Sequence, residues 1–132
     1  MEIGDIYSAT LTVTEEMAAS RAVDGVPHVF GTPYLIGFME ETAHKALLDD
    51  FEVGETSVGL ALNLEHSSPT PIGMNVRCDV KLVERNGILL DFEINAFDDA
   101  GSICTCTHRR AIVQRERIEA KAEKKFADSV KV

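Results

Sequence analysis

Three residues in the first half of the chain, Thr32, Glu40 and His66, have side chains that could act together in chemistry. A hydroxyl, a carboxylate and an imidazole are the groups that enzymes combine for proton transfer and for attack on a carbonyl carbon. Each residue also has an ordinary structural explanation. Whether these residues have a catalytic or a structural role therefore depends on the helices and strands that are predicted to hold them.

Glu40 is the most informative of the three, because helical spacing places it on a stripe that is otherwise apolar. The apolar members of this stripe are Ile36, Ala43 and Leu47. In the structural alternative, Glu40 extends its carboxylate to solvent or pairs with His44 one turn later, and the neighbouring Glu41 pairs with Lys45 in solvent. We favour a functional role for Glu40, because a carboxylate is rarely buried without a partner.

His66 and Thr32 gain weight from their predicted positions. His66 ends a strand at an inward-facing position before a proline-containing loop, which would place its ring at the mouth of a core-lined pocket. Thr32 precedes Pro33 at a helix start, where capping alone selects a threonine. The same place is the positive end of a buried helix, whose N–H groups can polarise a carbonyl. A hydroxyl there could serve chemistry.

The predicted helix separates Thr32 from Glu40 by eight residues, or roughly 12 Å along its axis, which is too far for both to act on one carbon atom. Either the helix begins nearer Gly37 and Thr32 lies on a loop that folds back, or the site combines Thr32 of one protomer with Glu40 of its partner. We favour the second arrangement.

The remaining histidines and the cysteines are weaker candidates. His28 lies in an irregular segment, His44 has Glu40 as a partner, and His108 precedes two arginines, so all three are expected to be structural or exposed. The cysteines, which we expect to be reduced thiols, are Cys78, Cys104 and Cys106. No C-x-x-C or H-x-x-x-H spacing, nucleophile elbow, phosphate loop or dinucleotide motif occurs, so no metal and no cofactor is expected.

Hydrophobic periodicity predicts one strand, a central helix and further antiparallel strands. The first strand is expected over residues 6–14, followed by an irregular or partly helical segment over 15–29. The helix is expected from Thr32 to about Leu48. Nearly every position of 34–39 is apolar, so protein should surround this helix on most sides.

After Gly54 the hydrophobic period changes to two, which predicts consecutive strands. The first should face the core with Val58, Leu60, Leu62, Leu64 and His66. The second should face it with Met74, Val76, Cys78, Val80 and Leu82, before a two-residue hairpin at Asn86-Gly87. The third should face it with Ile88, Leu90, Phe92, Ile94 and Ala96, before a last strand from Ser102 to Gln114.

Length and composition favour one domain over residues 1–132, with about 115–132 forming a solvated, frayed helical tail. The net charge of −9 disfavours binding to nucleic acid or to anionic membranes. Because the start has no leader pattern and no apolar run could span a bilayer, we expect a cytoplasmic location. Pairing of the open sheet edge across a two-fold axis predicts a homodimer.

The segments GTPYLIGFMEETA, LEHSSPTPIG and THRRAIV together resemble the fluoroacetyl-CoA thioesterase branch of the hot-dog thioesterase-like superfamily, over roughly residues 3–115. Thr32, Glu40 and His66 match the threonine, glutamate and histidine of that family at the same separations. The resemblance implies an α+β hot-dog fold, in which a curved antiparallel five-stranded sheet wraps a central helix. It also implies acyl-CoA hydrolysis without metal, at sites between the protomers of a dimer or a dimer of dimers.

The resemblance also indicates substrate contacts. Arg110 matches a family arginine, and we expect Arg110, Val26 and Gly31 to bind the substrate. The family's fluoroacetyl-CoA enzymes carry bulky aromatic residues before the helix, where this chain has Val23 and Val26, so fluoroacetyl-CoA is not the expected substrate. CoA is polyanionic and needs a local basic patch. The candidates for that patch are Arg77, Lys81, Arg109 and Arg110.

Two other functions compete with hydrolysis. The same fold could hold acyl-CoA without catalysis and report it through a dimer, in which case CoA would bind without thiol release. A dehydratase acting on enoyl or hydroxyacyl thioesters would need its own histidine and acidic pair facing the acyl β-carbon. Nothing in the sequence favours that pairing over hydrolysis.

Overall fold

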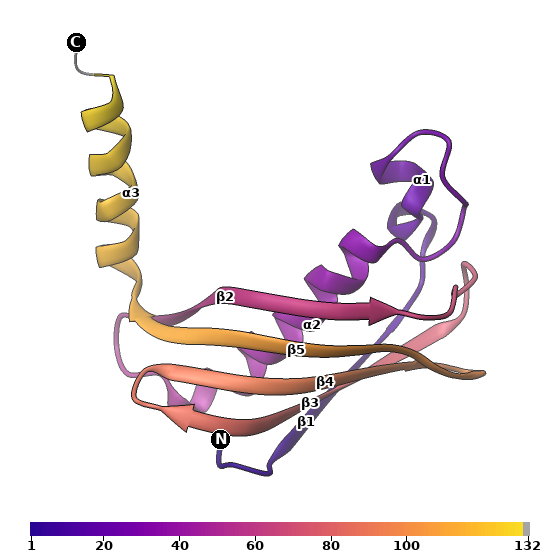
Figure 1. Ribbon diagram of the computed structural model, residues 1–132, viewed down its shortest axis with the longest axis horizontal. Helices are drawn as coiled ribbons and strands as arrows, with labels where there is room; N and C mark the ends of the chain where they lie inside the picture. The colour runs from indigo at the N-terminus through magenta and orange to yellow at the C-terminus, as the bar shows by residue number, and fades with distance from the viewer. Residues whose placement is uncertain (131–132) are drawn as a thin grey trace.

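A computed structural model, which describes residues 1–130, shows a five-stranded antiparallel sheet curved around one long helix (Figure 1). The strands are β1 (Ile6–Thr12), β2 (Glu55–His66), β3 (Asn75–Asn86), β4 (Leu89–Asp98) and β5 (Gly101–Gln114). The helices are α1 (Ala19–Ala22), α2 (Thr32–Ala46) and α3 (Arg115–Ser129), with short 3₁₀ turns η1 (Glu15–Met17) and η2 (Leu48–Asp50). The predicted α+β architecture is confirmed.

The strand order β1-β3-β4-β5-β2 places β3, β4 and β5 in the middle of the sheet. These strands alternate buried and exposed residues, and their buried side chains face α2. From α2 the core receives Leu35, Phe38, Met39, Thr42 and Ala43. The helix therefore buries one face against the sheet and leaves its opposite face partly open.

The hairpin between β3 and β4 forms one residue later than the Asn86-Gly87 signal predicts. Asn86 pairs with Leu89, so the two-residue loop consists of Gly87 and Ile88, with Gly87 at φ +62°. Only glycine and a few polar residues adopt this conformation without strain. Because Ile88 lies in the turn, it is 59% exposed, and its predicted place on the core face is wrong.

Strand β2 departs from strict alternation. Its register with β5 shifts between Gly59 and Ala61, so Leu60 is displaced from the ladder and is 54% exposed rather than on the core face. A bulge inserts one residue and reverses which side chains point inward. As a result Ser57 is buried on one side of the bulge, whereas Leu62 packs against the core on the other.

Two element boundaries differ from expectation. Helix α2 ends at Ala46 rather than near Leu48, and β1 ends at Thr12 rather than Thr14. Between β1 and α2 the chain forms η1, α1 and irregular segments. A bridge between Ala18 and Phe30 closes this region at the base of α2.

The sheet has two open edges, β1 and β2, and the β2 edge is 12 residues long. Helix α3 contains no buried residue and rises beyond β2, away from the sheet (Figure 1). Across residues 1–130 every helix is too short or too polar to span a bilayer.

Two neighbouring leucines after α2 differ in burial and test how this helix packs on the core. Leu47 is fully buried and Leu48 is 53% exposed. Leu47→Ala should lower the free energy of unfolding by about 2–5 kcal/mol, because it removes apolar contacts and leaves a cavity. Leu48→Ala should change it by less than about 0.5 kcal/mol. Urea denaturation measures both, and equal losses would contradict this packing.

Candidate active site

Thr32 and His66 meet in the same chain. The Thr32 hydroxyl lies 2.8 Å from Nδ1 of His66, which is hydrogen-bonding distance. Thr32 is the first residue of α2 and His66 is the last residue of β2, so 34 positions of sequence separate them. The structure thus brings together two of the three residues singled out by type and spacing.

Thr32 does not cap its helix as predicted. The cap is Gly31, and no side chain bonds the first turn of α2. Tyr34 and Leu35 both donate their N–H groups to the Gly31 carbonyl, at 3.0 Å each. Because the Thr32 side chain turns to His66 instead, its hydroxyl remains available for chemistry beside the positive end of a 15-residue helix.

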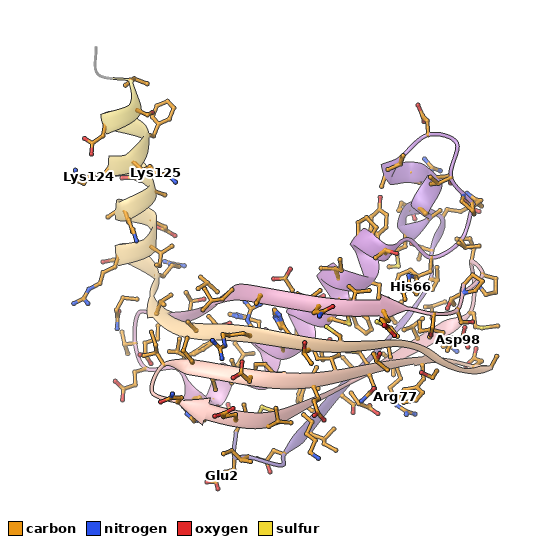
Figure 2. The ribbon with its side chains drawn as sticks, viewed as in Figure 1. Glu2, His66, Arg77, Asp98, Lys124 and Lys125 are labelled. Atoms are coloured by element: carbon orange, nitrogen blue, oxygen red, sulfur yellow. The ribbon has the colours of Figure 1, made fainter. Side chains whose placement is uncertain are left out.

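His66 is held at the end of β2, as Figure 2 shows, by a fixed loop. Thr70 donates its hydroxyl to Asp98 at 2.8 Å, and its carbonyl accepts the Phe30 N–H at 2.8 Å. The loop after His66 is therefore attached to the segment that leads into Thr32. The pocket between them has a volume of about 270 Å³ and includes Ala19, Val29, Phe30, Thr32, His66 and Pro69 in its lining.

Burial lowers the pKa of His66 below its ordinary value, and the Ser68 backbone partly opposes this shift. The Nε2 atom of His66 is buried and has no hydrogen-bond partner within residues 1–130. A lowered pKa keeps the ring neutral at neutral pH. A neutral imidazole beside a hydroxyl can accept its proton, which is what a general base does.

Glu40 lies away from this pair, where α2 faces Gly59 of β2 and Arg110 of β5. Its side chain is 43% exposed, so the prediction of a buried carboxylate is wrong. Helix α2 is continuous from Thr32, which excludes a helix that starts near Gly37. Thr32 and Glu40 are therefore about 12 Å apart along one helix and cannot meet at a single atom of the same chain.

Glu40 is the counter-ion of a buried arginine. Nη1 of Arg110 lies 3.3 Å from Oε2 of Glu40, and the Arg110 side chain is only 7% exposed. Burial lowers the pKa of Arg110, and the Glu40 carboxylate opposes that effect. Since an arginine remains charged in proteins, a guanidinium at this depth needs the carboxylate nearby.

Neutral groups of the sheet also form hydrogen bonds with Arg110. Its Nε donates to the Ser57 hydroxyl at 2.9 Å and its Nη2 to the Ser57 carbonyl at 3.1 Å. His108 donates from Nδ1 to the Ala61 carbonyl at 2.8 Å, which leaves its Nε2 to accept from Arg110 at 3.2 Å. These bonds fix the guanidinium so that one edge faces Glu40.

His44 does not pair with Glu40, as the structural alternative proposed. Its Nδ1 lies 2.7 Å from the Ser57 hydroxyl instead, and its ring packs against Phe51 at 5.3 Å between centroids. Burial, and then the charge of Arg110, lower the pKa of His44. The predicted pair of Glu41 and Lys45 does form, at 2.8 Å in solvent.

Gly59 allows Glu40 to approach the sheet. A Cβ at Gly59 would lie 2.8 Å from Oε2 of Glu40 and 3.3 Å from Nη1 of Arg110. Any larger residue would push the carboxylate away from the guanidinium. Sequence reasoning missed Gly59 and Ser57, although a glycine within a strand is a signal of close backbone approach.

The predicted substrate residues Val26 and Gly31 lie in the segment before α2, and Gly31 stands in the chain between the pocket residues Phe30 and Thr32. Val26 is 36% exposed on the loop between α1 and α2. His28 closes that loop, with Ser20 at 2.7 Å from one ring nitrogen and Glu15 at 2.8 Å from the other. Gly31 packs so tightly that a Cβ would lie 2.9 Å from the Ala19 backbone. Their contacts with substrate remain predictions.

Most cations of the predicted basic patch lie beside a carboxylate of the same chain. Arg77 pairs with Asp79 at 3.0 Å, Arg109 pairs with Asp91 at 2.8 Å, and Arg110 is buried on Glu40. Arg77 also lies over the Phe97 ring, 4.8 Å from its centroid. Three of the four expected cations therefore have their charge met within the chain.

The cysteines are free and buried, as expected of core residues. Burial raises the pKa of Cys78 to about 12 and that of Cys106 to about 11. Thiols with such values are not nucleophiles at neutral pH. Within residues 1–130, no three histidine, cysteine or acidic side chains lie close enough to hold a metal ion.

Comparison with known proteins places this geometry among thioesterases. The model of the family described as fluoroacetyl-CoA-specific thioesterase matches residues 13–116. A fluoroacetyl-CoA thioesterase from Streptantibioticus cattleyicolor is 33% identical over 99 residues, which are 75% of this chain and 71% of the relative.

Two solved structures show the same fold. A mutant of the fluoroacetyl-CoA-specific thioesterase, in complex with fluoroacetate and CoA, has a TM-score of 0.85 at 27% identity and covers 89% of this chain and 99% of its own. A hot-dog-like protein from Thermanaerovibrio acidaminovorans has a TM-score of 0.87 at 18% identity, covering 96% of this chain and 93% of its own. The predicted hot-dog fold is confirmed.

Three histidines of the site predict a loss of stability in acid. Burial is the largest cause that lowers the pKa of His44, His66 and His108. Between their folded values and the ordinary value near 6.5, the unfolded chain binds more protons than the folded chain. The stability that these histidines contribute is thus present above about pH 6.5 and lost as the pH falls through the folded values.

Urea denaturation at pH 7.5 and pH 5.5 measures this loss. His108→Gln, which removes one titrating ring but keeps a group that can accept from Arg110, should reduce the difference between the two pH values. Equal stability of the original chain at both pH values would show that the rings are not held neutral.

Proposed function

The chain belongs to the fluoroacetyl-CoA-specific thioesterase family, and from this membership and the geometry of its site we propose that it hydrolyses an acyl-CoA thioester to a free acid and CoA. The observation that carries the assignment of residues is the 2.8 Å contact between the Thr32 hydroxyl and Nδ1 of His66. A hydroxyl activated by a neutral imidazole is the pairing that acyl transfer needs.

In the proposed reaction, the thioester carbonyl lies near the first turn of α2, where the positive end of the helix stabilises negative charge on the carbonyl oxygen. His66 accepts a proton as an oxygen nucleophile attacks the carbonyl carbon. The carbon–sulfur bond then breaks, and the same proton goes to the departing CoA sulfur. One water is consumed, and a carboxylic acid and a thiol are released.

Two nucleophiles fit this scheme. Thr32 itself can attack, which gives an acyl ester that water hydrolyses in a second step, or Thr32 can orient a water that attacks directly. Thr32→Ser keeps the hydroxyl in both cases. The two routes differ in whether an acylated chain accumulates, which mass spectrometry of a rapidly quenched reaction detects.

Glu40 enters the site from the second protomer in this proposal. Helix α2 keeps Glu40 about 12 Å from Thr32 of its own chain. The carboxylate lies against Arg110 and Gly59 on the β2 side of the sheet and is 43% exposed, so it can orient or activate the nucleophile bound to a facing copy. Support for a facing copy comes from the 12-residue β2 edge, which in one chain has a strand on only one side.

Mixed dimers test whether the site is shared. Glu40→Gln and His66→Ala homodimers should each lose at least about a hundredfold in kcat, the scale of general acid–base catalysis. A purified heterodimer of the two variants has one intact site, because His66 of one chain meets Glu40 of the other. Its turnover should be about half that of the original dimer.

The matched control is a heterodimer of His66→Ala with Thr32→Ala. Both residues belong to the same half of the site, so neither of its two sites is complete and no turnover should return. If the first heterodimer is also inactive, the site does not combine the two chains. Because Glu40→Gln leaves Arg110 without its counter-ion, a melting curve must accompany it, and Glu40→Asp provides a variant that keeps the charge.

The acid limb of the pH profile tests the role of His66. Since burial lowers the pKa of His66, the base form persists below the ordinary histidine value. In the chain and in Thr32→Ser, kcat/KM should therefore fall with a midpoint below about pH 6.5. Thiol release from an acyl-CoA at each pH gives the profile. A midpoint above that value would exclude a desolvated His66 as the base.

The same assays separate hydrolysis from ligand binding. Tight CoA binding by calorimetry with no thiol release from any member of a panel, from acetyl- to palmitoyl-CoA, would indicate a non-catalytic binding module. Hydration of an enoyl-CoA without thiol release would indicate a dehydratase.

A further inference from the structure

The chain carries a net charge of −9, yet the proposed substrate carries several phosphate charges. Three of the four cations expected to bind these phosphates are occupied, because Arg77, Arg109 and Arg110 each lie against a carboxylate. A thioesterase that acts on CoA esters therefore needs other cations within reach of its site. Without them, the negative charge of the protein would repel the phosphates of the substrate.

Helix α3 supplies three such cations. Arg117, Lys121 and Lys125 follow one another at intervals of four residues, so they form a row along one side of the helix. None of the three makes an ion pair with any residue in the range 1–130. Figure 2 shows Lys125 and its neighbour Lys124 on this helix, well away from the sheet.

Helix α3 packs little against the rest of its own chain. None of its residues is buried, and it rises past the β2 edge into space that no other part of the chain occupies (Figure 1). Beside the basic row runs an apolar row of Ile118, Ala122 and Phe126, of which Phe126 is 71% exposed. A helix of this length in isolation is marginal in water.

The register of the sheet decides which site α3 can serve. Helix α3 starts directly after Gln114, which pairs with Glu55 at the first position of β2. His66 is at the last position of β2, 11 steps away, or about 36 Å at the rise of an extended strand. The base of α3 therefore lies at the opposite end of the sheet from the His66 of its own chain.

A second copy reverses this relation. If two β2 edges pair antiparallel about a two-fold axis through their middle, the first residues of one β2 lie beside the last residues of the other. The end that carries α3 in one chain then meets the end that carries His66 and Thr32 in its partner. The direction in which α3 leaves the sheet, past the β2 edge, takes it toward that partner.

We propose that Arg117, Lys121 and Lys125 of one protomer bind the phosphate groups of CoA whose acyl group lies in the active site of the other protomer. This site rests on the shared dimer of the proposed function. Lysine and arginine at intervals of one helical turn present several N–H donors to phosphate oxygens. The acyl end, by contrast, contacts Thr32 and His66.

The test replaces all three cations with glutamine. Because phosphate contacts act in binding and not on the reacting carbon, KM for an acyl-CoA should rise roughly tenfold while kcat stays the same. The probe is the acyl-CoA with the highest kcat/KM in the panel, compared with the N-acetylcysteamine thioester of the same acyl group, which has no phosphate. KM for the phosphate-free thioester should not change.

A control variant loses cations that lie elsewhere. Lys45 pairs with Glu41 on α2, and Arg85 is on β3, which β4 and β5 separate from β2. Their double glutamine variant should leave KM for acyl-CoA within about twofold, because salt screens charges that lie far from the bound phosphates. An equal rise in the α3 variant and this control, or an equal rise for both substrates, would overturn the phosphate site.

Mixed dimers show which protomer each helix serves. A heterodimer of the α3 triple variant with His66→Ala has one working Thr32–His66 pair, which belongs to the chain with the neutralised helix. If the partner's α3 serves that site, KM returns to its original value. A KM that stays high would place the phosphates on the helix of the same chain and contradict the proposal.

Calorimetry with free CoA and with CoA lacking its 3′-phosphate separates this inference from the hydrolysis itself. If no acyl-CoA releases a thiol, the proposed reaction fails, but weaker CoA binding by the α3 triple variant than by its control still supports the phosphate site. If hydrolysis proceeds and CoA binds both variants equally, the site on α3 fails alone.

Discussion

The rigidity of helix α2 is the constraint on which the rest of the site depends. Its first residue, Thr32, touches His66, and its ninth, Glu40, touches Arg110. A continuous helix keeps these two points about 12 Å apart, because each residue adds a fixed rise. The packing of α2 against the central strands makes this separation permanent, so under the proposed function one chain holds two halves of a site and not one whole.

Each half is built to stay ready in the absence of substrate. In the first, burial lowers the pKa of His66, and its ring stays neutral beside a hydroxyl that no helix cap consumes. In the second, Ser57 and His108 hold the Arg110 guanidinium from inside the sheet, and Arg110 holds the Glu40 carboxylate. A preorganised arrangement of this kind costs little reorganisation when a charged transition state forms.

The two halves explain features that are otherwise idle in one chain. The long β2 edge, the partly open face of α2 and the projecting α3 all lie where a second copy would pack under the proposed two-fold pairing. An acidic protein can then bind an anionic substrate. Most cations of the sheet form local ion pairs, and the unpaired row on α3 is left to bind the anionic ligand.

The sequence by itself determined the order of the elements, most of the core faces of β3 and β4, and the presence of a two-residue hairpin to within one residue, because hydrophobic period and turn chemistry are local properties. It also singled out Thr32, Glu40 and His66, since their types and spacing match a known family. It could not place Leu60 outside the ladder, because a bulge depends on the partner strand and leaves no local pattern.

Only the tertiary structure decided the partners of the polar residues. Thr32 looked like a helix cap and instead contacts His66, and Glu40 looked like a buried partner of His44 and instead neutralises Arg110. The same applies to Ser57 and Gly59, which carry no chemical signal in the sequence yet set the position of the guanidinium and its carboxylate. Hydrogen bonds join residues by distance in space, and strand pairing and helix packing set that distance across 34 to 70 positions of chain.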